Sequence, residues 1–274
     1  MDLTQPSSAF CGGILSAGGI IWRRRPLQVA ALVALLAIAN LALAATESRD
    51  VAGFERIEFS LPGELVLEQG DFGVTLEGKT DDLEKVVTEV SGKKLEVRWR
   101  HGGWLGWGND GPDDKIRVVV SLPLLTGLEI AGSGDAGGGT WNAEKFQVTI
   151  NGSGSVDLDG VAAENLEIGI NGSGGVRIDG VDAAVLDLTI RGSGDVDLAG
   201  AADTQHITVA GSGDLDAADL EGANVTVGVM GSGNVKVWAR ETLDANVMGS
   251  GDVRYRGEAK VDRMEAGSGR VRPL

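Results

Sequence analysis

Apolar and polar residues alternate along most of residues 126–274. In the segment Ile150–Leu158, apolar residues and glycines occupy the even positions, whereas Asn, Ser and Asp occupy the odd ones. A period of two residues predicts β-strands with one buried side and one side in water. The pattern therefore predicts an all-β protein.

The tripeptide Gly-Ser-Gly recurs eight times within this pattern, at intervals of 18 to 20 residues. Its copies begin at Gly132, Gly152, Gly172, Gly192, Gly211, Gly231, Gly249 and Gly267. A fixed period of this length is typical of a solenoid, in which each repeat stacks on the previous one. Val, Ile and Leu flank successive copies at the same offsets and would form interior columns. We therefore expect a parallel β-helix with about 20 residues per coil.

Two other interpretations fit less well. A β-propeller or meander needs hairpin turns, and a unit of this length holds too few strands for a blade. A flexible Gly-Ser linker has no fixed period and no flanking apolar columns. Each glycine costs about 0.5–1 kcal/mol relative to alanine in a strand, so the repeated glycines are expected where a Cβ would clash. We expect them to point inward, close to the opposite wall, with the serines outward in a ladder.

Residues 46–125 keep the alternation but lack the tripeptide. We expect irregular first coils here that cap one end of the tube, because an open end would expose strand edges. A helical turn is predicted from Thr80 to Lys85, with Thr80 as its cap. Regular coils would follow over 126–274, so that 46–274 forms one continuous domain.

Residues 1–45 have the features of an export signal, with a hydrophobic segment expected to be helical. Arg23–Arg25 precede the apolar run Leu27–Ala45, and Ala42–Ala44 match the A-x-A cleavage pattern. The run is also long enough to span a bilayer, so the segment is either a signal peptide or a membrane anchor. Both alternatives place the repeats in the periplasm or at the cell surface. Membrane contact is expected only through residues 27–45, if they are not cleaved.

The chain has 40 acidic and 24 basic residues, a formal net charge of −16. Such a surface is repelled by phosphate backbones, so nucleic acid is not an expected partner. The single cysteine, Cys11, lies before the apolar run. The mature domain is therefore expected to have no disulfide and no cysteine metal site.

Four residues near the middle of the N-terminal region form the first candidate site: Trp99, His101, Trp104 and Trp107. They crowd a glycine-rich stretch between two predicted strands. Aromatic side chains on a loop can stack on sugar rings or anchor a protein partner. The hypothesis is that they bind a glycan or a surface protein. The alternative is that they cover the open end of the tube.

Acidic columns form the second candidate. With coils of this length, Asp195 would lie over Asp214 and Asp159 over Asp179. Calcium binds clustered carboxylates and would relieve these like-charge contacts. The alternative is a row of solvated carboxylates that keeps the surface soluble. No other cofactor is predicted.

Catalytic motifs are sparse. The only histidines, His101 and His206, lie far apart in the sequence, and no common nucleophile or metalloprotease motif is present. Residues 73–80 match the nucleotide-binding pattern G-x-x-x-x-G-K-[ST], but they alternate like a strand. We therefore predict that the protein is not an enzyme.

Several segments resemble the head GIN domain of putative auto-transporter adhesins, over roughly residues 54–269. The resemblance rests on Phe54–Ile57, Val66–Gly70, Val87–Val90, Ile116–Pro123 and Leu128–Gly134. It implies a right-handed β-helix, a bacterial envelope or extracellular setting, and no established activity. We expect a non-enzymatic exported envelope protein with an adhesion, binding or scaffold surface. A polysaccharide lyase or hydrolase and a calcium-dependent structural module are the alternatives. The oligomeric state is left open.

Overall fold

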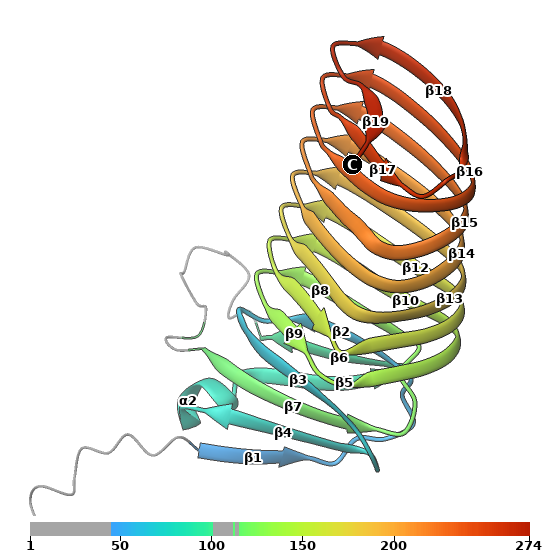
Figure 1. Ribbon diagram of the computed structural model, residues 1–274. Coiled ribbons are helices and arrows are strands. Elements are labelled where there is room, and N and C mark those ends of the chain that lie inside the picture. Colours follow the sequence, from blue (N-terminus) through green and yellow to red (C-terminus); the bar gives the residue numbers. More distant parts are fainter. Residues whose placement is uncertain (1–44, 101–111, 113–114) are drawn as a thin grey trace, which may run out of the picture. The chain divides into compact units, whose positions relative to one another are not determined.

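A computed structural model describes residues 45–100, 112 and 115–274. They form a β-solenoid of about seven turns, with roughly 20 residues per coil (Figure 1). The predictions for residues 1–44 and for His101, Trp104 and Trp107 lie outside the described residues. Within the described part, no helix is long and apolar enough to span a membrane.

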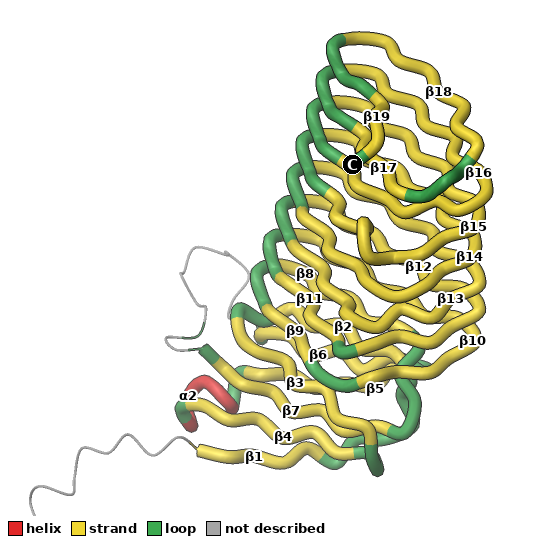
Figure 2. Tube along the Cα trace, in the orientation of Figure 1, coloured by secondary structure: helices red, strands yellow, loops and turns green. Residues whose placement is uncertain are grey.

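Residues 126–274 form the regular coils. Their strands are β8 (Gly127–Gly132), β9 (Asp135–Gly137), β10 (Thr140–Gly152), β11 (Ser155–Leu158), β12 (Gly160–Gly172), β13 (Gly175–Gly192), β14 (Asp195–Gly211), β15 (Leu215–Gly231), β16 (Val235–Gly249), β17 (Val253–Arg256), β18 (Lys260–Gly267) and β19 (Val271–Pro273). Successive coils pair in parallel, with Ile150 opposite Ile170 and Ile170 opposite Ile190. The predicted parallel stacking is confirmed here. The Gly-Ser-Gly turns stack along one edge of the solenoid, where the tube changes from strand to loop in Figure 2.

Residues 45–122 form the other end of the solenoid. Their elements are β1 (Ala45–Arg49), β2 (Arg56–Ser60), β3 (Gly63–Gln69), β4 (Gly73–Gly78), α2 (Thr80–Leu83), β5 (Val86–Ser91), β6 (Lys94–Trp99) and β7 (Ile116–Leu122). The N-cap position of α2 is occupied by Lys79, without a side-chain capping hydrogen bond, and Thr80 is the first helical residue, so the prediction of Thr80 as cap is wrong. The nucleotide-binding pattern falls mostly on strand β4 rather than on a loop.

The coils at this end are not stacked in sequence order. Strands β2 and β3 pair in parallel with β6 and β7 on one side and with β8 and β9 on the other. The first coil of the chain therefore lies between the second and the third. Three pairs are antiparallel: β4 with β7, β1 with β4, and β5 with β6. The expectation of a simple stack of same-direction windings is thus wrong for this end, because the chain reverses to cover the outer edges of β6 and β7.

Apolar columns fill the interior of the solenoid. One column of seven side chains is at most 1% exposed throughout: Ile130, Ile150, Ile170, Ile190, Val209, Val229 and Val247. Burying one such side chain contributes about 1.5–3 kcal/mol, so the columns dominate the stability of the stack. The alternation in the sequence predicts them because strand parity alone decides which side chains face inward.

The coil underneath, rather than the opposite wall, requires the repeated glycines. At Gly152 φ is +145°, and a Cβ there would lie 2.1 Å from the carbonyl oxygen of Gly132 in the previous coil. At Gly154 a Cβ would lie 2.1 Å from the carbonyl oxygen of Gly134. The first glycine of this triplet is half-buried and only the third is buried. The prediction that both glycines face the opposite wall is therefore wrong.

The serines of the tripeptide are exposed, as predicted. Their regular contact is through the backbone: the Ser153 amide donates to the carbonyl oxygen of Gly132 at 2.8 Å, and later coils repeat this bond. Among the described residues, a bond between two of these hydroxyls occurs where Ser268 Oγ donates to Ser250 Oγ at 3.0 Å. The glycine carbonyls thus hold the turns together, and the serine hydroxyls contribute less than expected.

Two charged residues occupy inward positions of the last coil. Arg263 lies opposite Ala245 and Glu265 opposite Val247 in the ladder between β16 and β18. Arg263 Nη1 donates to the Val271 carbonyl at 2.8 Å, and the Val271 amide donates to Glu265 Oε1 at 2.8 Å. Polar side chains therefore close the apolar tube at its C-terminal end.

Candidate binding groove

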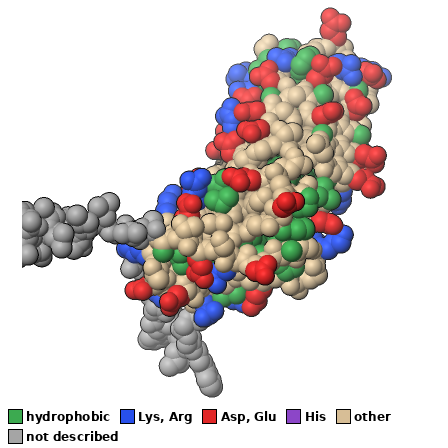
Figure 3. All heavy atoms as spheres, turned by 90° about the horizontal axis from the view of Figure 1, so that it is seen from below, with side chains coloured by type: hydrophobic (Ala, Val, Ile, Leu, Met, Phe, Trp, Pro, Cys, Tyr) green, Lys and Arg blue, Asp and Glu red, His purple; other side chains and the backbone are tan. Residues whose placement is uncertain are grey.

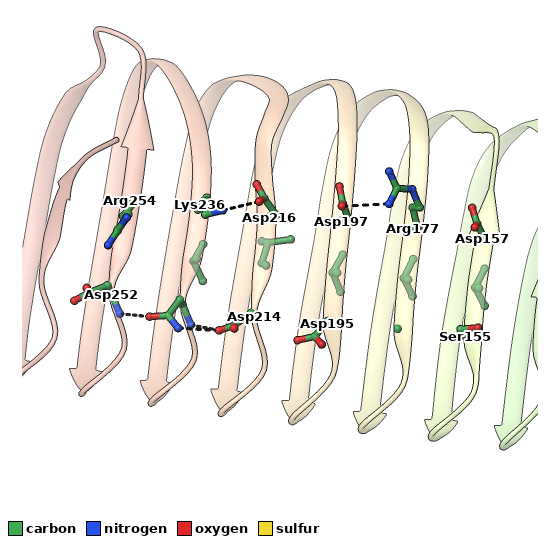
Figure 4. Close-up of a pocket in the computed structure, with 17 residues that line it drawn as sticks. Ser155, Asp157, Arg177, Asp195, Asp197, Asp214, Asp216, Lys236, Asp252 and Arg254 are labelled. Atoms are coloured by element: carbon green, nitrogen blue, oxygen red, sulfur yellow. Dashed lines mark hydrogen bonds and ion pairs between the residues drawn. The ribbon is translucent and has the colours of Figure 1, made fainter.

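A groove of about 700 Å³ runs along the outside of the stack across six consecutive coils (Figure 4). Two rows of side chains flank it. The first row comes directly after each tripeptide and contains Ser155, Gly175, Asp195, Asp214, Asn234 and Asp252. The second row lies two positions further on and contains Asp157, Arg177, Asp197, Asp216, Lys236 and Arg254.

The strand pattern explains both rows. The residue between them, such as Val156 or Val235, is buried, so its two neighbours must point to solvent. Neighbouring coils lie about 4.8 Å apart, so equivalent side chains form continuous rows. The floor of the groove is backbone that already pairs with the adjacent coils.

Side chains of the first row accept hydrogen bonds from the next coil. Asp214 Oδ1 accepts from the amide of Asn234 at 2.7 Å and from Asn234 Nδ2 at 3.0 Å. Asn234 Oδ1 accepts from the amide of Asp252 at 3.3 Å. The backbone amide of Asp195 donates to the Gly174 carbonyl, but its carboxylate has no hydrogen-bond or ion-pair partner within the described residues. Hydrogen bonds from the following coil therefore fix the side chains of Asp214 and Asn234, while the remaining carboxylate oxygens of the first row are available to a ligand.

Ion pairs run along the second row. Arg177 Nη1 lies 3.6 Å from Asp197 Oδ2, and its Nε lies 3.0 Å from Asp179 Oδ1. The charges of Asp179 and then Asp197 raise the pKa of the Arg177 guanidinium. Lys236 Nζ donates to Asp216 Oδ2 at 2.7 Å.

The groove is acidic, and its carboxylates include Asp216, whose pKa is shifted by its neighbours. The hydrogen bond from Lys236, aided by the amide of Ala218 and opposed by burial, lowers the pKa of the Asp216 carboxyl. With six acidic and three basic side chains along its walls, the groove has a net negative charge.

The four aspartates proposed for calcium lie on the outer surface in neighbouring coils. Figure 4 shows Asp195 and Asp214 in the same row, and Asp179 is paired with Arg177. Asp159 and Asp179 follow the paired residues Leu158 and Ile178. The described residues contain no group of three or more His, Cys, Asp or Glu side chains placed to hold a metal ion. Calcium binding stays a prediction, which a rise in melting temperature with millimolar calcium would test.

Trp99 is a core residue. It lies in β6 with 5% of its surface exposed, and Lys85 Nζ lies 5.5 Å from its ring centroid. The alternation of Leu95, Val97 and Trp99 predicts this strand position, and a binding role for Trp99 stays a prediction. The binding role of His101, Trp104 and Trp107 stays a prediction. His206 is exposed, as expected for a solvent-facing position beside Ile207.

Sequence analysis did not single out the basic residues at the C-terminal end of the groove, among them Lys236 and Arg254. Both are the third residue after a Gly-Ser-Gly tripeptide, so the repeat spacing in the sequence already places them in one column. On the face seen from below in Figure 3, acidic and basic side chains are interspersed.

A family model described as "Putative auto-transporter adhesin, head GIN domain" matches residues 53–181 and again residues 147–259. A solved structure of a putative lipid binding protein from Parabacteroides distasonis is 24% identical, with a TM-score of 0.77, covering 84% of this chain and 96% of that chain. A putative adhesin from Parabacteroides merdae is 20% identical, with a TM-score of 0.77, covering 84% and 95%. A comparison with curated proteins finds no match.

Proposed function

Because the chain belongs to the family of the head GIN domain of putative auto-transporter adhesins, we propose that it is a non-enzymatic, exported cell-envelope protein that binds a partner along its solenoid. The groove across six coils is the observation that carries the proposal. Export is supported by the apolar run at residues 27–45, which follows three arginines.

The shape of the groove favours an extended ligand. Small-molecule sites are usually enclosed, whereas this groove is long and open, with rows of charged and amide side chains on both sides. A ligand that lies along it meets one pair of outward positions in every coil, at a regular spacing. A polymer with a repeating unit fits this arrangement better than a compact molecule does.

The chemistry of the groove favours a glycan over a peptide strand. A peptide that adds to a sheet needs free backbone amides and carbonyls at an edge. The backbone at the groove floor is already paired with the coils on both sides. Side-chain carboxylates such as Asp195 and Asp214 can instead accept hydrogen bonds from sugar hydroxyls.

A glycan-binding screen with the full chain tests this proposal. Asp195→Asn removes an acceptor charge from the groove at nearly constant size, and Asp187→Asn makes the same change at an exposed position outside it. We expect the first variant to weaken binding about threefold to tenfold and the second to leave it unchanged. Equal binding by both variants would contradict the groove as the site.

The same samples test the enzymatic alternative. New reducing ends or unsaturated products from a bound polysaccharide, lost on substitution of a groove aspartate, would contradict a purely binding role.

A further inference from the structure

The charge of the stack changes sign at its last coil. Residues 126–249 contain 19 acidic and 5 basic side chains, whereas residues 250–274 contain 4 acidic and 6 basic side chains. The whole chain has a net charge of −16, so a segment in which basic side chains outnumber acidic ones differs from the rest of the protein.

Two of these cations, Arg254 and Arg272, stack in one column with Lys236 of the previous coil at the end of the groove. Lys236 pairs in register with Arg254, and Arg254 with Arg272. Like charges directly opposite one another on neighbouring strands destabilise a sheet. The column therefore costs stability unless something else compensates it.

The carboxylates nearby compensate only part of this charge. Asp216 binds Lys236, and Asp252 Oδ2 accepts from Arg272 Nη2 at 2.6 Å. Arg254 is exposed, and its guanidinium has no carboxylate or hydrogen-bond partner within the described residues.

Arg270 adds a further cation beside the column. Its Nη1 donates to the carbonyls of Gly267 and Gly269, so its charge is not neutralised by an acid. Two of the four cations thus lack a carboxylate partner where the groove meets the last coil.

We propose that this basic end binds the acidic groups of a polysaccharide that lies in the groove; the inference rests on the proposed function. Arginine forms short, paired hydrogen bonds with carboxylates and stays charged at any physiological pH. Arg254 is the residue that contacts the ligand, because its guanidinium is free and faces the groove (Figure 4).

The charge pattern also selects the kind of polyanion. A densely charged polymer would be repelled by Asp195, Asp197 and Asp214 further along the groove. These residues lie two or three coils from Arg254, roughly 10–15 Å at the usual strand spacing. That distance is at or beyond the Debye length of about 8 Å at physiological ionic strength. An acidic sugar at one end of an otherwise weakly charged glycan therefore avoids most of the repulsion.

The test compares an otherwise neutral oligosaccharide that ends in a single uronic acid with the methyl ester of the same oligosaccharide, which has the same backbone without the charge. Binding of the full chain is measured by calorimetry at low and at physiological salt. We expect the acidic form to bind about tenfold more tightly at low salt, with the difference shrinking as salt is added.

Variants locate the effect. Arg254→Gln should weaken binding of the acidic form about fivefold and leave the ester unchanged. Arg191→Gln is the matched control, because Arg191 is also exposed without a partner but lies outside the groove. Arg254→Glu should raise the melting temperature by relieving like-charge stacking while it abolishes acid-specific binding.

Equal binding of the two oligosaccharides would overturn the inference but leave the groove as a glycan site. Acid-specific binding that survives both Arg254 variants would place the site elsewhere and also overturn it. If neither oligosaccharide binds, the inference fails, and the glycan screen described above decides the proposed function separately.

Discussion

At the N-terminal end of the solenoid, antiparallel strands β1, β4 and β5 cover the outer edges of the neighbouring strands, whereas at the C-terminal end two charged side chains cross the mouth of the tube. Both arrangements protect apolar columns and limit pairing with other chains. One end uses the path of the backbone, and the other uses only the choice of Arg263 and Glu265. The difference shows that a solenoid end can be closed without any change in its coil geometry.

The largest effect is expected at the N-terminal end. Leu76 in β4 is fully buried and lies between β1 and β7. Leu76→Asp would bury a carboxylate without a partner and should lower the free energy of unfolding by about 4 kcal/mol. Urea denaturation measures this. A loss under 1 kcal/mol would mean that this end contributes little to the stability of the domain.

A smaller loss is expected in the coils between the two ends. Gly172 has φ of +138°, and a Cβ would lie 2.1 Å from the Gly152 carbonyl oxygen. Gly172→Ala should cost about 2–3 kcal/mol. Gly169→Ala is the control, since a Cβ there meets nothing within 4 Å. Equal stabilities for the two variants would refute the steric role of the coil underneath.

At the C-terminal end we expect a change in association rather than in stability. Arg263→Val with Glu265→Val should alter the free energy of unfolding by about 1 kcal/mol or less but produce larger species in size-exclusion chromatography. Lys260→Val with Asp262→Val makes the same change in charge at outward positions of β18. If this control associates to the same extent, inward placement is not what blocks association.

The smallest effect is expected in the groove, away from both ends. The folded-state pKa of Asp216 is lowered, so its ion pair with Lys236 stabilises the protein above the carboxyl's ordinary pKa and is lost as the pH falls below it. Asp216→Asn should therefore cost less than about 1 kcal/mol at pH 7, because the pair is largely exposed. The difference from wild type should vanish at strongly acidic pH. A difference that persists there would point to packing instead of charge.

The regular coils could be predicted from the sequence because one rule, alternation with a fixed period, decides both which side chains face inward and which residues pair. The same rule places Asp195 and Arg254 in their rows. It could not predict the coil order at the N-terminal end. Strands β2 and β6 show the same alternation of apolar and polar residues. This alternation indicates which side chains face inward, but it does not indicate which strand pairs with which.

Close contacts were equally hidden from the sequence. The clash that requires Gly154 is with a backbone carbonyl of the coil below, and no side-chain pattern reports backbone positions. The lack of a partner for Arg254 depends on where Asp252 directs its oxygens, which is toward Arg272 and the amide of Arg270.

The insertion of the first coil between the second and third has a consequence for the order of assembly. Thr126 Oγ1 donates to the carbonyl of Glu55 across 71 residues of sequence, whereas regular coils contact neighbours about 20 residues away. Contacts over long stretches of chain form slowly, because the intervening loop must close first. Strands β2 and β3 must therefore wait for residues 94–137 before both of their edges are paired. The regular coils need only neighbours about 20 residues away, so folding of this domain should begin in the regular coils and finish with β2 and β3.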